Sequence, residues 1–260
     1  MIELPTVLSG FGVGAVVGLT GIGGGALMTP VLILIFGVAP HTAVGTDLLF
    51  ACITKLFGVM LHGRFGTVDW QIVGRLAAGS LPLALVTLLV LTYTDSAQIR
   101  SGMIIQALGV ALLLTAVGLF LRRRLHEIGK DLRTNTPSRF KSVQPVLTVV
   151  AGMIVGVLVA LTSVGAGALG TVMLVYLYPY RMAGAKIVGT DLAHAIPLTL
   201  IAGLGHLMLG NVDFGLLGQL LLGSIPGILI GAMVSTHVPE AFVRNSIGAV
   251  LLLVAGKLLL

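Results

Sequence analysis

The chain has 260 residues, of which 57% are hydrophobic and 9% are charged, and its mean hydropathy is +1.10. Soluble domains use about 25% charged residues and could not cover so much apolar surface, which excludes an ordinary water-soluble fold. The 36 glycines and 10 prolines agree with membrane helices, where both residues are commoner than in soluble ones. The one cysteine, Cys52, excludes an internal disulfide and is interpreted as an apolar filler.

The net charge of +6 arises largely from one basic segment between apolar runs. A short basic connection is typical of the cytoplasmic side under the positive-inside rule, so the charge indicates topology and not nucleic-acid binding. We expect a first membrane repeat at 1–121, a basic cytoplasmic loop at 122–142 and a second membrane repeat at 143–260. The first apolar run is expected to belong to the mature protein, because no Lys or Arg precedes it. The basic segment holds Arg122, Arg123, Arg124, Lys130, Arg133, Arg139 and Lys141.

Ten apolar runs, separated by Gly, Pro or charged residues, are predicted to be helices. The second run of each half, 24–37 and 167–178, would reach only about 21 and 18 Å as a straight helix, against about 30 Å of hydrocarbon. Both are predicted to be short or re-entrant segments that do not cross a membrane alone. The other runs are 5–20, 39–62, 69–92 and 96–121 in the first half, and 143–162, 183–208, 213–235 and 239–260 in the second.

The two halves repeat one ancestral unit. Val44–Leu48 recurs letter for letter as Val188–Leu192, and the spacing of 144 residues then holds as far as Arg100 and Arg244. Between the Gly-rich blocks and this motif the second half has a two-residue insertion. Because either expected number of crossings per half, about three or five, is odd, the second half would enter from the opposite side. We therefore predict an all-α polytopic membrane protein of two inverted repeats, about five helical segments each, with both termini outside.

The strongest local signal is a Gly-rich block between a full apolar run and a short one in each half. Such a cluster weakens a helix by about 1 kcal/mol per Gly relative to Ala, which favours a broken helix whose free N–H groups can bind an oxyanion. The alternative is close packing of helices through small residues. The predicted substrate-binding residues in the blocks are Thr20, Gly21, Gly23, Gly24 and Gly25 with Thr162, Ser163, Gly165 and Gly167.

Asp47 and Asp191 end the repeated Val-Gly-Thr-Asp motif about 12 Å into their helices. An ionisable residue at that depth indicates function, here proton coupling or cation coordination beside the site. The alternative is that both residues cap a helix that begins at the glycine of the motif. Thr46 and Thr190, which precede the aspartates, are predicted to line the substrate cavity.

Lys55 lies well inside the third run and has Thr199 at the matching place of the second half. It either supplies positive charge to an anion path or extends its amine to the inner surface. For Arg75 we favour the surface orientation, and for His62 and His206 a hydrogen-bonded place at a helix end. The remaining histidines lack metal-ligand spacing, so no metal site is predicted. Catalytic and nucleotide-binding motifs are absent as well, which predicts that the chain is not an enzyme.

At these motifs the chain resembles the TauE/SafE sulfite exporter family of bacterial membrane permeases. The resemblance rests on Gly21–Gly25 followed by Pro30, on Ala43–Asp47 and on their second-half echoes, and it spans nearly the whole length. It implies a secondary carrier that exports sulfite or an organosulfonate such as sulfoacetate, driven by an ion gradient. The second block departs from the pattern at Ser163 and Ala166.

The predicted function is therefore export of a small sulfur-containing oxyanion by alternating access across the bacterial cytoplasmic (inner) membrane. The alternative within transport is a cation or metal permease that uses the paired aspartates. A non-transporting scaffold is disfavoured by the broken helices. The expected partners are a small anionic substrate and the lipid bilayer, with a homodimer as a candidate assembly, and no cofactor or nucleic acid is expected.

Overall fold

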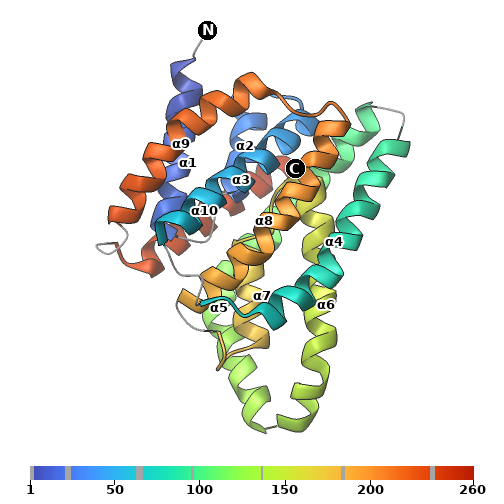
Figure 1. The fold of residues 1–260 in the computed structure, drawn as a ribbon, viewed down its shortest axis with the longest axis vertical. Coiled ribbons are helices and arrows are strands. Elements are labelled where there is room, and N and C mark those ends of the chain that lie inside the picture. Colours follow the sequence, from blue (N-terminus) through green and yellow to red (C-terminus); the bar gives the residue numbers. More distant parts are fainter. Residues whose placement is uncertain are drawn as a thin grey trace.

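The protein, seen here as a computed structural model, is described for residues 3–20, 25–62, 67–94, 97–135, 137–182, 185–234 and 238–260. These residues form ten α-helices and no strand (Figure 1). The helices are α1 (Leu4–Thr20), α2 (Gly25–Leu34), α3 (Pro40–His62), α4 (Trp70–Tyr93), α5 (Ala97–Asn135), α6 (Pro137–Thr162), α7 (Ala168–Leu177), α8 (Ala185–Met208), α9 (Phe214–Val234) and α10 (Glu240–Leu259).

The helices confirm the predicted all-α polytopic class. Each apolar run is one helix, and α2 and α7, with 10 residues each, are the short segments that the sequence predicts. At about 1.5 Å per residue they extend about 15 Å, half the hydrocarbon thickness. Within the described part of the chain, six helices are long and apolar enough to cross a membrane: α4, α5, α6, α8, α9 and α10.

The basic segment 122–142, which the sequence predicts as a cytoplasmic loop, is helical on both sides of residue 136. α5 continues for 39 residues to Asn135, and α6 begins at Pro137. Together they form a hairpin that extends beyond the other helices (Figure 1). Hydropathy marks only the part of a helix that lies in lipid. Arg, Lys and Glu also favour helix in water, so α5 and α6 extend beyond their apolar runs.

Glycines bring α1 and α9 into backbone contact along their length. A methyl group added to Gly14 would lie 2.6 Å from Cα of Ser224, and one added to Gly227 would lie 2.9 Å from the backbone nitrogen of Ala15. The same contact joins α6 and α4, because a methyl group on Gly156 would lie 2.7 Å from Cα of Ser80. Small residues therefore let these helix pairs approach as closely as membrane helices do.

These contacts are reciprocal between the halves. The first helix of each half packs on the fourth helix of the other, so α1 meets α9 and α6 meets α4. The equivalent helices α3 and α8 also meet, and they run antiparallel, since Leu49 lies against Gly203 and Cys52 Sγ faces the carbonyl of Ile196. α5 and α10 are antiparallel in the same way, with Gly109 against Leu259.

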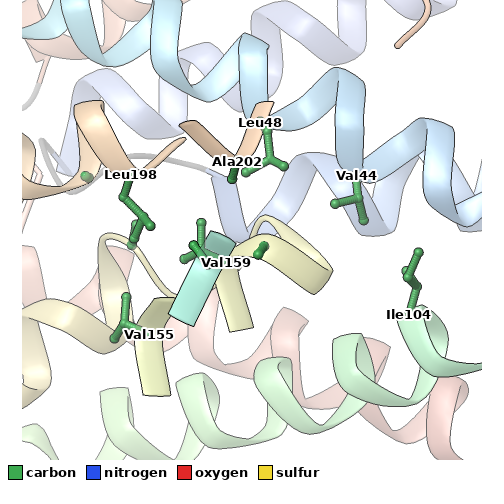
Figure 2. Packing of buried hydrophobic residues seen from close by; sticks show 11 residues of the cluster. Val44, Leu48, Ile104, Val155, Val159, Leu198 and Ala202 are labelled. Carbon is green, nitrogen blue, oxygen red and sulfur yellow. The ribbon is translucent and has the colours of Figure 1, made fainter. Parts of the chain in front are cut away.

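The centre of the bundle is an apolar cluster contributed by both halves (Figure 2). Val44 and Leu48 of α3 contribute to it together with Leu198 and Ala202 of α8, and all four are fully buried. Val155 and Val159 of α6 and Ile104 of α5 complete the part that Figure 2 labels. Because Asp47 lies between Val44 and Leu48 on α3, the fold carries a carboxylate into this core.

Candidate functional site

The second Gly-rich block breaks the chain between α6 and α7. α6 ends at Thr162 and α7 begins at Ala168. Ser163, Gly165 and Gly167 between them have φ angles of 61°, 127° and 131°. Positive φ is open to glycine and uncommon for serine, which explains two of the glycines in the block. The predicted break is therefore present in this half.

In the first half, α1 ends at Thr20 and α2 begins at Gly25. The predicted substrate residues Gly21, Gly23 and Gly24 lie outside the described residues. The end of α1 matches that of α6 in the repeat, and α2 begins one residue earlier than α7 does.

Asp191 reaches from α8 to the start of α7. Its carboxylate lies beside the backbone N–H of Gly167, the residue that precedes α7. The carboxylate also lies against Gly170, where an added methyl group would be 2.7 Å from Oδ1. A negative group at a helix N-terminus is stabilised by the helix dipole and by the free N–H groups. Asp191 therefore occupies an anion site that the break creates.

Asp47 makes the equivalent contact in the first half. Its Oδ2 accepts hydrogen bonds from the backbone N–H of Thr29 on α2 at 3.2 Å and from the Thr29 hydroxyl at 2.5 Å. The Ser163 hydroxyl of the second-half break lies beside the same carboxylate. However, neither Ser163 Oγ nor Asp47 Oδ1 has a hydrogen-bond partner of good geometry among the described residues. The two halves thus meet at unsatisfied polar atoms.

Lys55 is buried in the protein interior, near both aspartates. Its side chain is 2% exposed, and its ammonium group donates a 2.9 Å hydrogen bond to the carbonyl of Ala166 in the break. Both Asp47 and Asp191 are close enough to interact electrostatically with it. The amine therefore points into the bundle and not to the inner surface. We call Asp47, Lys55, Ser163 and Asp191 the ionic cluster.

Two predicted site residues lie away from the ionic cluster. The hydroxyl of Thr46 accepts a hydrogen bond of 3.1 Å from the N–H of Asp213, and that of Thr190 accepts one of 3.0 Å from the N–H of Asp69. Each threonine thus holds the residue ahead of the fourth helix of the other half. These contacts explain why the Thr-Asp pair is repeated, with the threonine joining the halves and the aspartate facing a break.

The other predicted hydroxyls bond to their own helices. Thr20 Oγ1 donates to the carbonyl of Val16 at 2.8 Å, and Thr162 Oγ1 donates to that of Leu158 at 2.6 Å. Thr162 Oγ1 also accepts from the N–H of Val164, which fixes the first residues of the break.

Two buried histidines are satisfied by hydrogen bonds. His206 Nε2 lies 2.9 Å from the carbonyl of Ala160, and its Nδ1 lies 3.3 Å from the amide nitrogen of Asn211. Since a carbonyl only accepts, the Nε2 of His206 carries the hydrogen and its Nδ1 accepts. His194 Nε2 pairs with the Ser80 hydroxyl at 2.8 Å. Of His62 the structure describes the backbone only.

Sequence reasoning missed Thr29, the residue that holds Asp47. A signal was available, because Gly-Ala-Leu-Met-Thr at 25–29 recurs as Gly-Ala-Leu-Gly-Thr at 167–171. Sequence reasoning also missed the hydrogen bond from Lys55 to a backbone carbonyl, because residue spacing does not predict such a contact. Within the described part of the chain, no three His, Cys, Asp or Glu residues converge on a place that could hold a metal ion.

Comparison with known proteins assigns the family. The model of the family described as "Sulfite exporter TauE/SafE" matches residues 6–258. The chain belongs to this family. Among curated relatives, the probable membrane transporter protein YjnA of Bacillus subtilis (strain 168) is 40% identical over 213 residues, which are 80% of each chain. No solved structure matches the chain with significance.

Two further relatives of this TauE/SafE protein have similar names. The probable membrane transporter protein YdhB of Bacillus subtilis (strain 168) is 26% identical over 93% of this chain and 94% of its own. The probable membrane transporter protein MJ0441 of Methanocaldococcus jannaschii is 29% identical over 80% of this chain and 73% of its own. The TauE/SafE protein is thus a membrane transporter and not an enzyme, as the sequence predicts.

Proposed function

We propose that this TauE/SafE protein exports a small sulfur-containing oxyanion, sulfite or an organosulfonate such as sulfoacetate, across the cytoplasmic membrane. The observation that carries the proposal is the ionic cluster at the break between α6 and α7. Lys55 supplies a buried positive charge there, Ser163 supplies a hydroxyl without a hydrogen-bond partner of good geometry among the described residues, and Gly167 supplies a backbone N–H. Ammonium, hydroxyl and amide donors are the groups that bind a tetrahedral oxyanion.

Asp191 and the substrate would compete for the same donors. Because the Asp191 carboxylate already lies beside the Gly167 N–H, an oxyanion can bind there only when this carboxylate withdraws or loses its charge. A proton on Asp191 would remove the repulsion between two anions and free the Gly167 N–H. We therefore infer that the proton is the coupling ion and that Asp47 and Asp191 carry it.

The charge balance of the ionic cluster supports the same mechanism. Two carboxylates and one ammonium group, all at most 2% exposed, leave one negative charge without compensation. Uncompensated charge is costly inside a membrane protein, and a proton or a cation would neutralise it. The ammonium of Lys55 already supplies one positive charge near both carboxylates, which disfavours a divalent cation there and hence the alternative of a metal permease.

We further infer that the two halves are inverted repeats with both termini outside and the α5–α6 hairpin in the cytoplasm. Equivalent helices that run antiparallel, α3 with α8 and α5 with α10, support this arrangement. The basic residues of the hairpin support its place inside through the positive-inside rule. Alternating access would then rock one half against the other around the ionic cluster.

Flux into liposomes that contain the purified protein tests the proposal. Sulfite, sulfoacetate, sulfate and divalent cations are compared with and without an imposed proton gradient. We expect flux of sulfite or sulfoacetate that changes with the proton gradient, and none of divalent cations. Divalent cation flux without flux of any anion would contradict the proposal and favour the metal permease.

A further inference from the structure

A basic pocket lies at the end of the molecule from which the α5–α6 hairpin extends. Its volume is about 570 Å³, and it opens between α4, α5, α6, α8 and the connection from α7 to α8. None of the described residues that line it is acidic. We call it the basic pocket after its five cationic residues, Arg75, Arg133, Lys141, Arg181 and Lys186.

Asp69 beside the pocket offsets part of this charge. Arg181 binds the carboxylate through Nε at 2.6 Å and Nη2 at 2.9 Å, and Lys186 Nζ lies 3.4 Å from it. Burial raises the pKa of Asp69, but the hydrogen bonds and the charge of Arg181 outweigh this effect and hold the pKa below its ordinary value. Asp69 is therefore ionised at neutral pH, and it pairs with two of the five cationic residues, Arg181 and Lys186.

The pocket is level with the ends of the membrane spans. The apolar spans of α4, α6 and α8 begin at Trp70, Phe140 and Lys186, next to residues that line the pocket. Trp70 and Tyr180 are exposed at the same end, with 66% and 64% of their surface accessible. Trp and Tyr are enriched where a membrane meets water, and basic pockets between helices at this level bind phosphate head groups.

The pocket is a departure from the internal repeat. The connection between α7 and α8 has seven residues, whereas the one between α2 and α3 has five. The longer connection places Tyr178 against Arg75, with 3.3 Å between the Tyr178 hydroxyl and Nη1, and places Arg181 at the rim. The longer connection thus contributes Tyr178, Pro179, Tyr180 and Arg181 to the lining of the pocket, and the other lining residues lie on α4, α5, α6 and α8.

We propose that the basic pocket binds a phosphate-bearing anion, either the head group of an anionic lipid or soluble phosphate. Arginine presents forked donors that match phosphate oxygens, and Arg75 and Arg133 bring such donors to the pocket from α4 and α5, whereas Arg181 already donates to Asp69 and Gln71. The half-buried side chain of Arg75 forms the floor with Tyr178, which is 4% exposed. This proposal is independent of the transported substrate.

Thermal unfolding of the purified protein in detergent, titrated with phosphatidylglycerol, phosphatidylcholine or inorganic phosphate, tests the pocket. We expect phosphatidylglycerol or inorganic phosphate to raise the Tm, and phosphatidylcholine to leave it unchanged. Lys141→Gln and Arg75→Gln should each weaken the apparent affinity about fivefold. Lys141 is exposed, so its replacement leaves the fold intact, and Lys141→Arg should retain binding.

Arg124→Gln is the matched control, because Arg124 is exposed on α5 and does not line the pocket. A response to phosphatidylglycerol alone assigns the pocket to lipid, and a response to inorganic phosphate assigns it to a soluble anion. Equal affinities in all the glutamine variants and the parent would overturn the proposal. So would a parent protein whose Tm responds to neither phosphatidylglycerol nor phosphate.

Discussion

The ammonium group of Lys55 on α3 donates a 2.9 Å hydrogen bond to the carbonyl oxygen of Ala166, in the break between α6 and α7. This bond joins the two halves at the point where the second half is not helical. The next residue, Gly167, has its N–H beside the Asp191 carboxylate. The position of the amine and the state of the carboxylate are therefore linked through one short stretch of backbone.

Replacing Lys55 with Met should destabilise the protein strongly. It removes the positive charge near two buried carboxylates and leaves the Ala166 carbonyl without its donor, and loss of a hydrogen bond to a charged group costs about 1.5–3 kcal/mol. Thermal unfolding in detergent measures the loss, and Asp191→Asn in the same chain should restore part of it. Lys257→Met, at an exposed position of α10, is the control and should have little effect. A Lys55→Met variant as stable as the parent would refute the role of the amine.

Asp47→Asn should abolish the response of transport to an imposed pH gradient. Asparagine keeps an oxygen that can accept from Thr29 but cannot exchange a proton. Proteoliposome flux with and without the gradient provides the measurement. Asp213→Asn is the matched control, because Asp213 caps α9 through Leu216 at an exposed position. An unchanged pH response in Asp47→Asn would count against proton coupling at this residue.

Gly167→Val should abolish transport while the protein still inserts into the membrane. The φ angle of 131° at Gly167 is strained for any other residue, at a cost of about 1–3 kcal/mol, and valine would displace the N–H that lies beside Asp191. We expect the same of Gly24→Val, at a position outside the described residues. Gly74→Val on α4, where an added side chain meets nothing within 4 Å, is the control for flux. Normal flux in both loop variants would place the site elsewhere.

Gly14→Leu should separate α1 from α9, since its first side-chain carbon would lie 2.6 Å from Cα of Ser224. Overpacking of this kind costs about 1–3 kcal/mol. Gly12→Leu on the same helix faces open space and should leave the Tm unchanged. Equal Tm values for the two variants would show that the close approach of α1 and α9 contributes nothing to stability.

Cysteine labelling tests the inverted arrangement. Cys52 is 3% exposed, so it gives an unreactive background for single added cysteines. Arg124→Cys on the hairpin should react with a membrane-impermeant maleimide only from the cytoplasmic side, and Leu260→Cys at the C-terminus only from outside. If both positions react from the same side, the halves do not have the orientation that we propose.

Much of the fold follows from hydropathy. Ten apolar runs predict ten helices, and the shortness of 24–37 and 167–178 predicts the 10-residue α2 and α7. The ends at 121 and 143 are wrong as helix ends, because α5 and α6 continue to Asn135 and from Pro137. Hydropathy indicates where the segment that lies in lipid ends. A segment rich in Arg, Glu and Leu has a high helix propensity, so the helix can continue beyond that point.

The residue types of the site follow from the repeat, but their roles do not. The duplicated Thr-Asp motif identifies Asp47 and Asp191, yet it gives Thr46 and Thr190 the same weight, although their hydroxyls bond to the connections before α9 and α4. On a helix, consecutive residues point about 100° apart. Which of two neighbours faces the break is decided by the packing of α3 and α8.

The sequence alone determines that the protein lies in a lipid bilayer, where its helices are, and that its two halves are duplicated. Each of these depends on local composition or on repeated sequence motifs. Only the tertiary structure decides that Lys55 of the first half bonds to Ala166 of the second, and that four helices and the connection from α7 to α8 enclose a basic pocket. Both features join residues that are far apart along the chain. Their contact depends on how closely the glycine-lined helices approach each other. The spacing of residues within one segment does not predict that distance between helices.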